Sequence, residues 1–265
     1  MAILCLITLL QQQIGISPMP RFFITIEYDG TDFVGWQRQD NGDSIQACLE
    51  HAASAILGQR QDVAVQGAGR TDTGVHALGQ VAHCDLPDSF NERQLPLALN
   101  AHLPVSIRVI RASIVADDAH ARFDAIMRRY RYRIHQRRIA SPLLMGRVWH
   151  LGQSLDAGAM HEAAQLLVGK HDFTSFRATH CQAASPVRTI DQIDVTEHDD
   201  EIWISVSARS FLHHQVRNIT GSLVLIGQGR WSNDDLLEAL NSRDRSAAGQ
   251  TAPAEGLYLT DVIYR

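Results

Sequence analysis

The spacing of apolar residues along the chain predicts amphipathic helices separated by short strands. The clearest helix covers residues 43–57, where apolar side chains recur every three or four positions. We expect Asp43 to cap its first turn, Gln46 to complete a capping box, and Gly58 to end it. Similar spacing predicts helices at residues 91–102, 156–168 and 212–226, and another that starts at Ser232.

Alternating or continuous apolar runs predict the strands. They fall at residues 22–28, 63–66, 78–84, 106–115, 128–135, 187–196, 202–208 and 257–264. Several of these strands follow one another without an intervening helix, which favours antiparallel hairpins over regular parallel units. The sequence therefore predicts an α+β protein made of two similar αβ lobes, whose mostly antiparallel sheet forms a central platform covered by helices.

We expect the N-terminal αβ lobe to span residues 21–117 and the C-terminal lobe residues 118–265, after an extension at residues 1–20. The extension contains a run of nine residues, 2–10, that is too short to cross a membrane and lacks the basic start of a signal peptide. Met19 precedes the first strand, so we expect the natural start there. The four cysteines form no CxxC pair, which favours a reducing, cytoplasmic compartment.

Positive charge is concentrated in one segment of an acidic chain. Residues 128–138 read RRYRYRIHQRR and hold six of the 24 basic residues, which leaves 18 basic against 29 acidic residues elsewhere. On a strand, Arg and Tyr would alternate between the two faces. A basic strand with aromatic rings suits RNA, so the candidate RNA-binding residues are Arg128, Arg129, Arg131 and Arg133.

The candidate catalytic segment is GAGRTDTGVH, residues 67–76. It is no dinucleotide-binding fingerprint, because Asp72 replaces the third glycine and a strand follows. It also lacks the GK[ST] of a P-loop. An Asp in such a turn often only fixes the turn through its own side chain. Alternatively, Arg70 keeps the Asp72 carboxylate ionised for attack on, or stabilisation of, a sugar anomeric carbon.

Several motifs in order give the chain a specific resemblance. They are GRTDTGVHA (69–77), YDGTDFVGWQRQ (28–39), HARFDA (120–125), RRYRYRI (128–134), DFTSFR (172–177), FLHHQVRNITGSL (211–223) and AEGLYL (254–259). Together they resemble the tRNA pseudouridine synthase A family over nearly the whole chain from Phe22. Thr73 departs from the Ala that is commonest in the family, and residues 1–20 match nothing in its pattern.

The resemblance implies that uridines 38, 39 and 40 in the anticodon stem-loop of tRNA are isomerised to pseudouridine. It also implies a two-lobed α+β fold with a basic cleft, a homodimer, and neither metal nor organic cofactor. By motif, Asp72 is the catalytic carboxylate, Tyr130 contacts the base and assists proton removal from C5, and Arg217 pairs with Asp72. Arg70 would hold the RNA with its base extruded, and Leu257 would pack against that base.

Two other functions remain open on the residues alone. A non-catalytic RNA-binding module would use the basic strand without forming pseudouridine, and a glycoside hydrolase would need a second carboxylate that the sequence does not mark. The pair His213 and His214 has no carboxylate or Cys at ligand spacing, so we interpret both as polar groups on a helix surface.

Overall fold

A computed structural model describes residues 19–59 and 61–265. Up to residue 18, the predicted N-terminal extension therefore lies outside the described residues. The strands are β1 (Arg21–Tyr28), β2 (Gln66–Gly67), β3 (His76–Asp85), β4 (Ile107–Val115), β5 (Met127–His135), β6 (Trp149–His150), β7 (Gly169–Asp172), β8 (Val187–His198), β9 (Glu201–Ala208) and β10 (Leu257–Ile263). The helices are α2 (Ile45–Ile56), α3 (Gln94–Asn100), α4 (Ala157–Gln165), α5 (Gln215–Gly227) and α6 (Asn233–Ser242).

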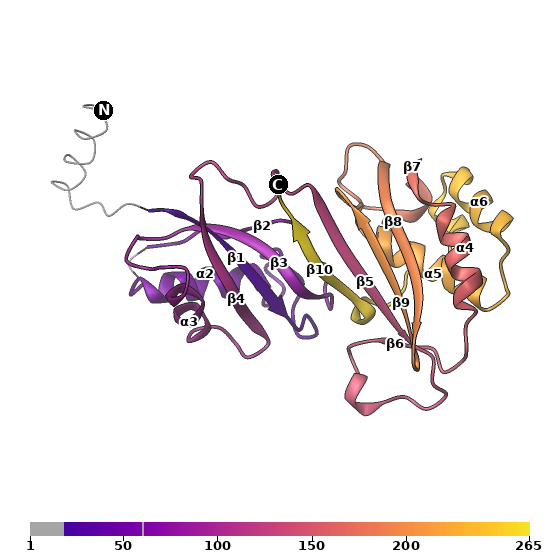
Figure 1. The fold of residues 1–265 in the computed structure, drawn as a ribbon, viewed down its shortest axis with the longest axis horizontal. Helices are drawn as coiled ribbons and strands as arrows, with labels where there is room; N and C mark the ends of the chain where they lie inside the picture. The colour runs from indigo at the N-terminus through magenta and orange to yellow at the C-terminus, as the bar shows by residue number, and fades with distance from the viewer. Residues whose placement is uncertain (1–18, 60) are drawn as a thin grey trace.

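One sheet runs through the whole molecule (Figure 1). Its strand order is β4-β1-β3-β10-β5-β9-β8-β7, with β2 paired to β3 and β6 paired to β5. All pairs are antiparallel except β10 with β3 and β5 with β6. This confirms the mostly antiparallel α+β class. The division into lobes at residue 117 stays a prediction.

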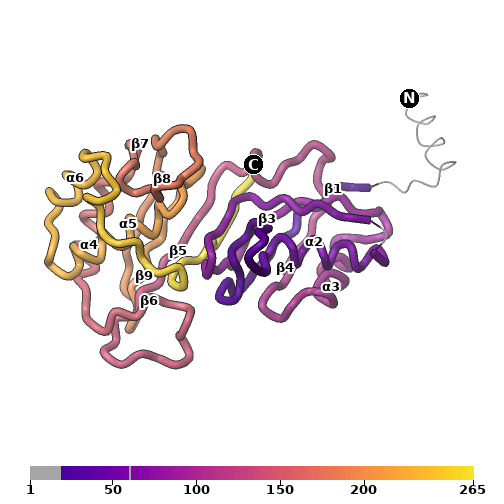
Figure 2. Tube along the Cα trace, turned by 180° about the vertical axis from the view of Figure 1, so that it is seen from behind, coloured from indigo at the N-terminus to yellow at the C-terminus, as the bar shows by residue number. Residues whose placement is uncertain are grey.

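The C-terminal strand β10 lies in the middle of the sheet, between β3 and β5. Helices α2 and α3 lie at the β4 end, and α4, α5 and α6 lie at the β7 end (Figures 1 and 2). Leu257 and Leu259 of β10 belong to the two different hydrophobic clusters under these helices. Since residues two apart on a strand point to the same side, both groups of helices cover the same face of the sheet.

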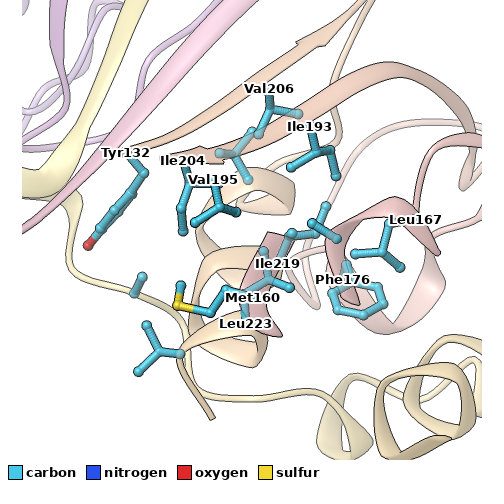
Figure 3. Packing of buried hydrophobic residues seen from close by; sticks show 14 of the residues in the cluster. Tyr132, Met160, Leu167, Phe176, Ile193, Val195, Ile204, Val206, Ile219 and Leu223 are labelled. Atoms are coloured by element: carbon cyan, nitrogen blue, oxygen red, sulfur yellow. The ribbon is translucent and has the colours of Figure 1, made fainter. Parts of the chain in front are cut away.

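The larger hydrophobic cluster explains how α5 is fixed. Side chains of the β5, β8 and β9 strands face the helix, among them Tyr132, Ile193 and Ile204 (Figure 3). Ile219 and Leu223, one turn apart on α5, are fully buried against them. Each such side chain contributes about 1.5–3 kcal/mol by leaving water. The N-terminal end of α5 is therefore held firmly relative to the sheet.

Two predicted helix starts differ from the structure. Ser44, not Asp43, caps α2: its side chain accepts from the Ala47 N–H, while the Asp43 carbonyl accepts from the Val34 N–H. The predicted capping box is absent there, because the Gln46 side chain instead bonds other groups. Helix α3 is shorter than residues 91–102, since the side chain of Asn91 accepts from two backbone N–H groups in a turn before it.

Other expectations differ in extent. Helix α5 starts at Gln215 rather than residue 212, because His214 adopts a left-handed backbone with φ of 62°. The strand expected at 63–66 is only Gln66–Gly67, and the short strands β6 and β7 lie outside the predicted ranges. Among the helices of the described residues, none is long and apolar enough to span a bilayer.

Candidate active site

Asp72 opens a tight turn between β2 and β3. The Val75 N–H donates to the Asp72 carbonyl at 3.1 Å, which closes a four-residue turn. Gly74 occupies the third position with a φ of +76°, as a type II turn requires. The Thr73 hydroxyl donates to the Val34 carbonyl at 3.0 Å. The backbone around Asp72 is therefore fixed, as the sequence predicts.

The segment 29–36 supports this turn from beneath. The Trp36 N–H donates to the Thr71 carbonyl at 3.0 Å, and the Thr71 hydroxyl lies 2.8 Å from that of Tyr28. A Cβ at Gly30 would lie 2.0 Å from the Val75 oxygen, and one at Gly35 would lie 2.6 Å from the Thr71 oxygen. Because only glycine permits this approach, the segment and the turn pack backbone against backbone.

Three cationic or cationisable side chains surround the Asp72 carboxylate, all from the start of α5 or the residues before it. Arg217 Nη1 lies 3.1 Å from Oδ2, and Arg217 Nε donates to the Ala252 carbonyl at 2.8 Å. His213 Nε2 lies 3.2 Å from Oδ1, and His214 Nε2 lies 3.4 Å from Oδ2. The structure thus brings together Asp72 and Arg217, the pair implied by the resemblance.

The interpretation of His213 and His214 as surface polar groups was wrong. Their carboxylate partner is distant in sequence, so spacing along the chain could not reveal it. The left-handed backbone at His214 lets two successive imidazoles face the same carboxylate. The available signal was their place three and four residues before Arg217, which is one helical turn.

These neighbours set the ionisation of the site. Burial acts to raise the pKa of Asp72, but the hydrogen bond from His213 and the charges of His214 and Arg217 outweigh it and hold the pKa below its usual value. The hydrogen bond with Asp72 raises the pKa of His213. Burial, together with the nearby cations, lowers the pKa of His214. Asp72 is therefore an ionised carboxylate at neutral pH.

Tyr130 and Leu257 lie on the helix-covered face of the sheet, beside the site. Tyr130 on β5 pairs with Leu259 of β10, and its ring meets that of Phe211 edge-on with centroids 5.2 Å apart. Burial raises the pKa of Tyr130, and the negative charge of Asp72 acts in the same direction. Leu257 is buried in the larger cluster. Tyr130 is therefore a neutral phenol near the carboxylate.

Arg70 does not have the electrostatic role predicted from its place beside Asp72. Its side chain is exposed, and among the described residues it forms no ion pair with that carboxylate. Residues two apart in this turn direct their side chains apart, and Arg217 and His213 take the position next to the acid. The prediction that Arg70 keeps Asp72 ionised was wrong.

Arg128 was predicted to bind RNA, but its guanidinium is occupied inside the protein. It is buried, and it donates to the backbone carbonyls of Ala68, Arg122, Ala125 and Arg209. Buried cations need such partners, because an unpaired one is costly. Arg128 is therefore unavailable to a phosphate.

The other three candidate RNA-binding arginines lie on the sheet face opposite Tyr130, because strand residues alternate. Arg131 stacks over the Trp203 ring at 4.3 Å, and Arg133 pairs with Glu201 at 2.6 Å. Arg129 is exposed on the same face. The predicted alternation of Arg and Tyr is confirmed, but it directs these arginines away from Asp72, so the prediction that they serve its site was wrong.

Asp72, His213 and His214 also have the donor set of a transition-metal site. One ligand atom from each residue lies within 4.8 Å of the others, and imidazole nitrogens with a carboxylate oxygen suit Zn²⁺. Arg217, however, already supplies a positive charge to this carboxylate. The two main cavities, of about 420 and 130 Å³, are lined by His135 and its neighbours and not by this triad. The basic cleft stays a prediction.

A solved structure of an archaeal box H/ACA sRNP Nop10–Cbf5 complex is a remote match. The sequence identity is 10% and the TM-score is 0.33, and the match covers 85% of this chain and 59% of that chain. A similarity this weak carries no argument about the present chain.

Sequence relatives are much closer. A tRNA pseudouridine synthase A from Rhodopseudomonas palustris (strain BisA53) is 59% identical over 247 residues, which are 93% of this chain and 100% of that protein. A protein of the same name from Rhodospirillum rubrum (strain ATCC 11170) is 56% identical over 248 residues, 93% of this chain and 88% of that protein. The model of the tRNA pseudouridine synthase family matches residues 24–124 and 163–265. The chain therefore belongs to the tRNA pseudouridine synthase family.

Proposed function

We propose that this protein isomerises uridine to pseudouridine in the anticodon stem-loop of tRNA, at positions 38, 39 and 40, with Asp72 as the catalytic carboxylate. The observation that carries the proposal is the Asp72 carboxylate itself, which is fixed by a turn and kept ionised by Arg217 and His213. Family membership supports tRNA uridine as the substrate.

The reaction breaks the N1–C1′ bond, rotates the uracil, and joins C5 to C1′. N1 gains a proton and C5 loses one, so no water, oxidant or leaving group is consumed. An ionised carboxylate can attack C1′, add to C6, or remove the C2′ proton to give a glycal. All three routes use Asp72. The target base must first leave the stack, at a cost of about a few kcal/mol.

The neighbouring residues take complementary roles in this proposal. Tyr130 contacts the extruded uracil and, as a neutral phenol, takes part in moving the C5 proton. Leu257 packs against the same base, and Arg217 orients Asp72. Arg70, exposed on the loop that carries Asp72, contacts the RNA and keeps the base extruded. We further propose two lobes, at residues 21–117 and 118–265, a basic cleft between them, a homodimer, and a cytoplasmic location.

The test is to map pseudouridine in unmodified tRNA after incubation with the purified protein. New pseudouridine at positions 38–40 supports the proposal, and modification at other sites alone would reject the anticodon specificity. Binding without any pseudouridine would indicate an RNA-binding module, whereas release of free uracil would indicate a hydrolase. Sedimentation of the same sample measures whether the protein is a dimer.

A further inference from the structure

Arg128 is a buried cation that holds backbone rather than an acid. Its Nη1 donates to the carbonyls of Arg209 at 2.7 Å and Ala125 at 3.1 Å. Its Nη2 donates to those of Ala68 at 2.7 Å and Arg122 at 2.6 Å. Among the described residues it forms no ion pair. One guanidinium therefore joins three separate segments of the chain.

Each joined segment carries an exposed arginine. Arg70 follows Ala68 by two residues, and Arg122 and Arg209 themselves supply two of the bonded carbonyls. Across the part of the chain that the structure describes, none of these three side chains pairs with an acid. Three unpaired guanidiniums thus start from backbone that meets at Arg128.

The same region exposes an aromatic ring. Phe123 is 68% exposed, which is unusual for so large an apolar side chain. The Arg122 guanidinium lies 5.7 Å from the centre of this ring, and the His120 ring lies 4.3 Å from it. The acid in this segment, Asp124, accepts the His120 N–H at 2.7 Å and so bonds locally. A flat ring beside free cations is the arrangement that binds an unstacked base and its phosphates.

We propose that Arg128 positions an RNA-contact surface, formed by Arg70, Arg122, Phe123 and Arg209, which binds the RNA strand beside the target uridine. This rests on the proposed function, and it extends that function to residues outside the Asp72 site. The surface adjoins the site along the chain, since Ala68 lies four residues before Asp72 and Arg209 four before His213. Because the chain as a whole carries a net charge of −5, a local cluster of unpaired arginines favours a polyanion at this place.

The contact residues are tested by measuring the binding of unmodified tRNA at several salt concentrations. Arg122→Ala and Arg209→Ala should each lower the slope of log K against log salt by about 0.9, as for one lost phosphate contact. Phe123→Ala should weaken binding about tenfold and leave the slope unchanged. The matched controls are Arg230→Ala and Leu97→Ala, which remove an exposed arginine and an exposed apolar side chain elsewhere. Contact variants that bind like the controls would overturn the surface.

Arg128 is tested by kinetics with Arg128→Lys. Lysine keeps the charge but cannot donate to four carbonyls at once. We expect the KM for tRNA to rise about tenfold, with a smaller change in kcat. A KM equal to that of Arg230→Ala would overturn the positioning role. If Arg128→Lys does not fold, the salt slopes of Arg122→Ala and Arg209→Ala decide instead. Wild-type protein that forms no pseudouridine rejects the proposed function, whereas active wild type with unaffected variants rejects this surface alone.

Discussion

Arg217 joins the Asp72 carboxylate to the C-terminal segment. Its Nη1 lies 3.1 Å from Asp72 Oδ2, while its Nε donates to the Ala252 carbonyl at 2.8 Å. The guanidinium can do both because its donors diverge in one plane. Since α5 is buried against the sheet through Ile219 and Leu223, this side chain transmits a fixed position to the carboxylate.

Replacing Arg217 by lysine should therefore reduce catalysis more than binding. Lysine cannot reach Asp72 and Ala252 together, so the carboxylate loses its fixed orientation. We expect kcat to fall about 10²-fold, the range seen when one preorganised electrostatic partner is removed. Single-turnover kinetics with saturating enzyme measure this. An unchanged kcat with a weaker tRNA affinity would show that Arg217 binds RNA instead of orienting Asp72.

The histidines give the site a spectroscopic signature. The pKa of His213 is raised by its hydrogen bond to Asp72, so this interaction stabilises the fold fully below the unfolded pKa of about 6.5 and is lost as the pH rises through the folded pKa. In Asp72→Asn, burial acts unopposed, and the pKa of His213 should fall below its usual value. NMR titration of the imidazole protons measures both proteins. Identical titration curves would contradict the contact.

Tyr130 offers a separation of chemistry from packing. Tyr130→Phe keeps the ring against Phe211, and the hydroxyl has no hydrogen-bond partner among the described residues, so stability should change by less than about 0.5 kcal/mol. Loss of a proton-transfer group should slow the reaction about 10²-fold or more. Thermal unfolding and product formation are measured on one preparation. A fully active Tyr130→Phe would leave the tyrosine only a packing role.

The glycines beneath the Asp72 turn can be tested by adding a methyl group. Gly35→Ala places a Cβ 2.6 Å from the Thr71 oxygen at a φ of +107°, and should destabilise the fold by about 1–3 kcal/mol. Gly69→Ala, on the catalytic loop itself, meets no atom within 4 Å and serves as the control. Urea unfolding compares the two variants. Equal midpoints would mean that the segment 29–36 does not support the turn.

The sequence predicted the elements whose local pattern decides them. The period of apolar residues located α2, α4 and most strands, and the glycines located the turn at Asp72. It could not show that β10 enters the sheet between β3 and β5, because no local pattern encodes which strands meet. The Ser44 cap was missed since Asp43 and Ser44 are both good capping residues, and only the tertiary bond of the Asp43 carbonyl to Val34 distinguishes them.

The site was predictable where a motif marks it and not where space does. Asp72, Arg217 and Tyr130 came from motifs, and the structure places them together. His213 and His214 could not be recognised, because their partner lies about 140 residues away in the sequence. Arg128 looked like a surface cation for the converse reason: a run of arginines gives no sign of which side chain turns inward to backbone carbonyls.

The central claim is that the Asp72 carboxylate performs the chemistry, and Asp72→Asn tests it most directly. The substitution keeps the side chain's size and its place between Arg217 and His213, and removes only the charge. The measurement is tritium release from C5-labelled uridine in tRNA, alongside tRNA binding by the same variant. The account predicts no detectable release with binding retained. Release near the wild-type rate would contradict it.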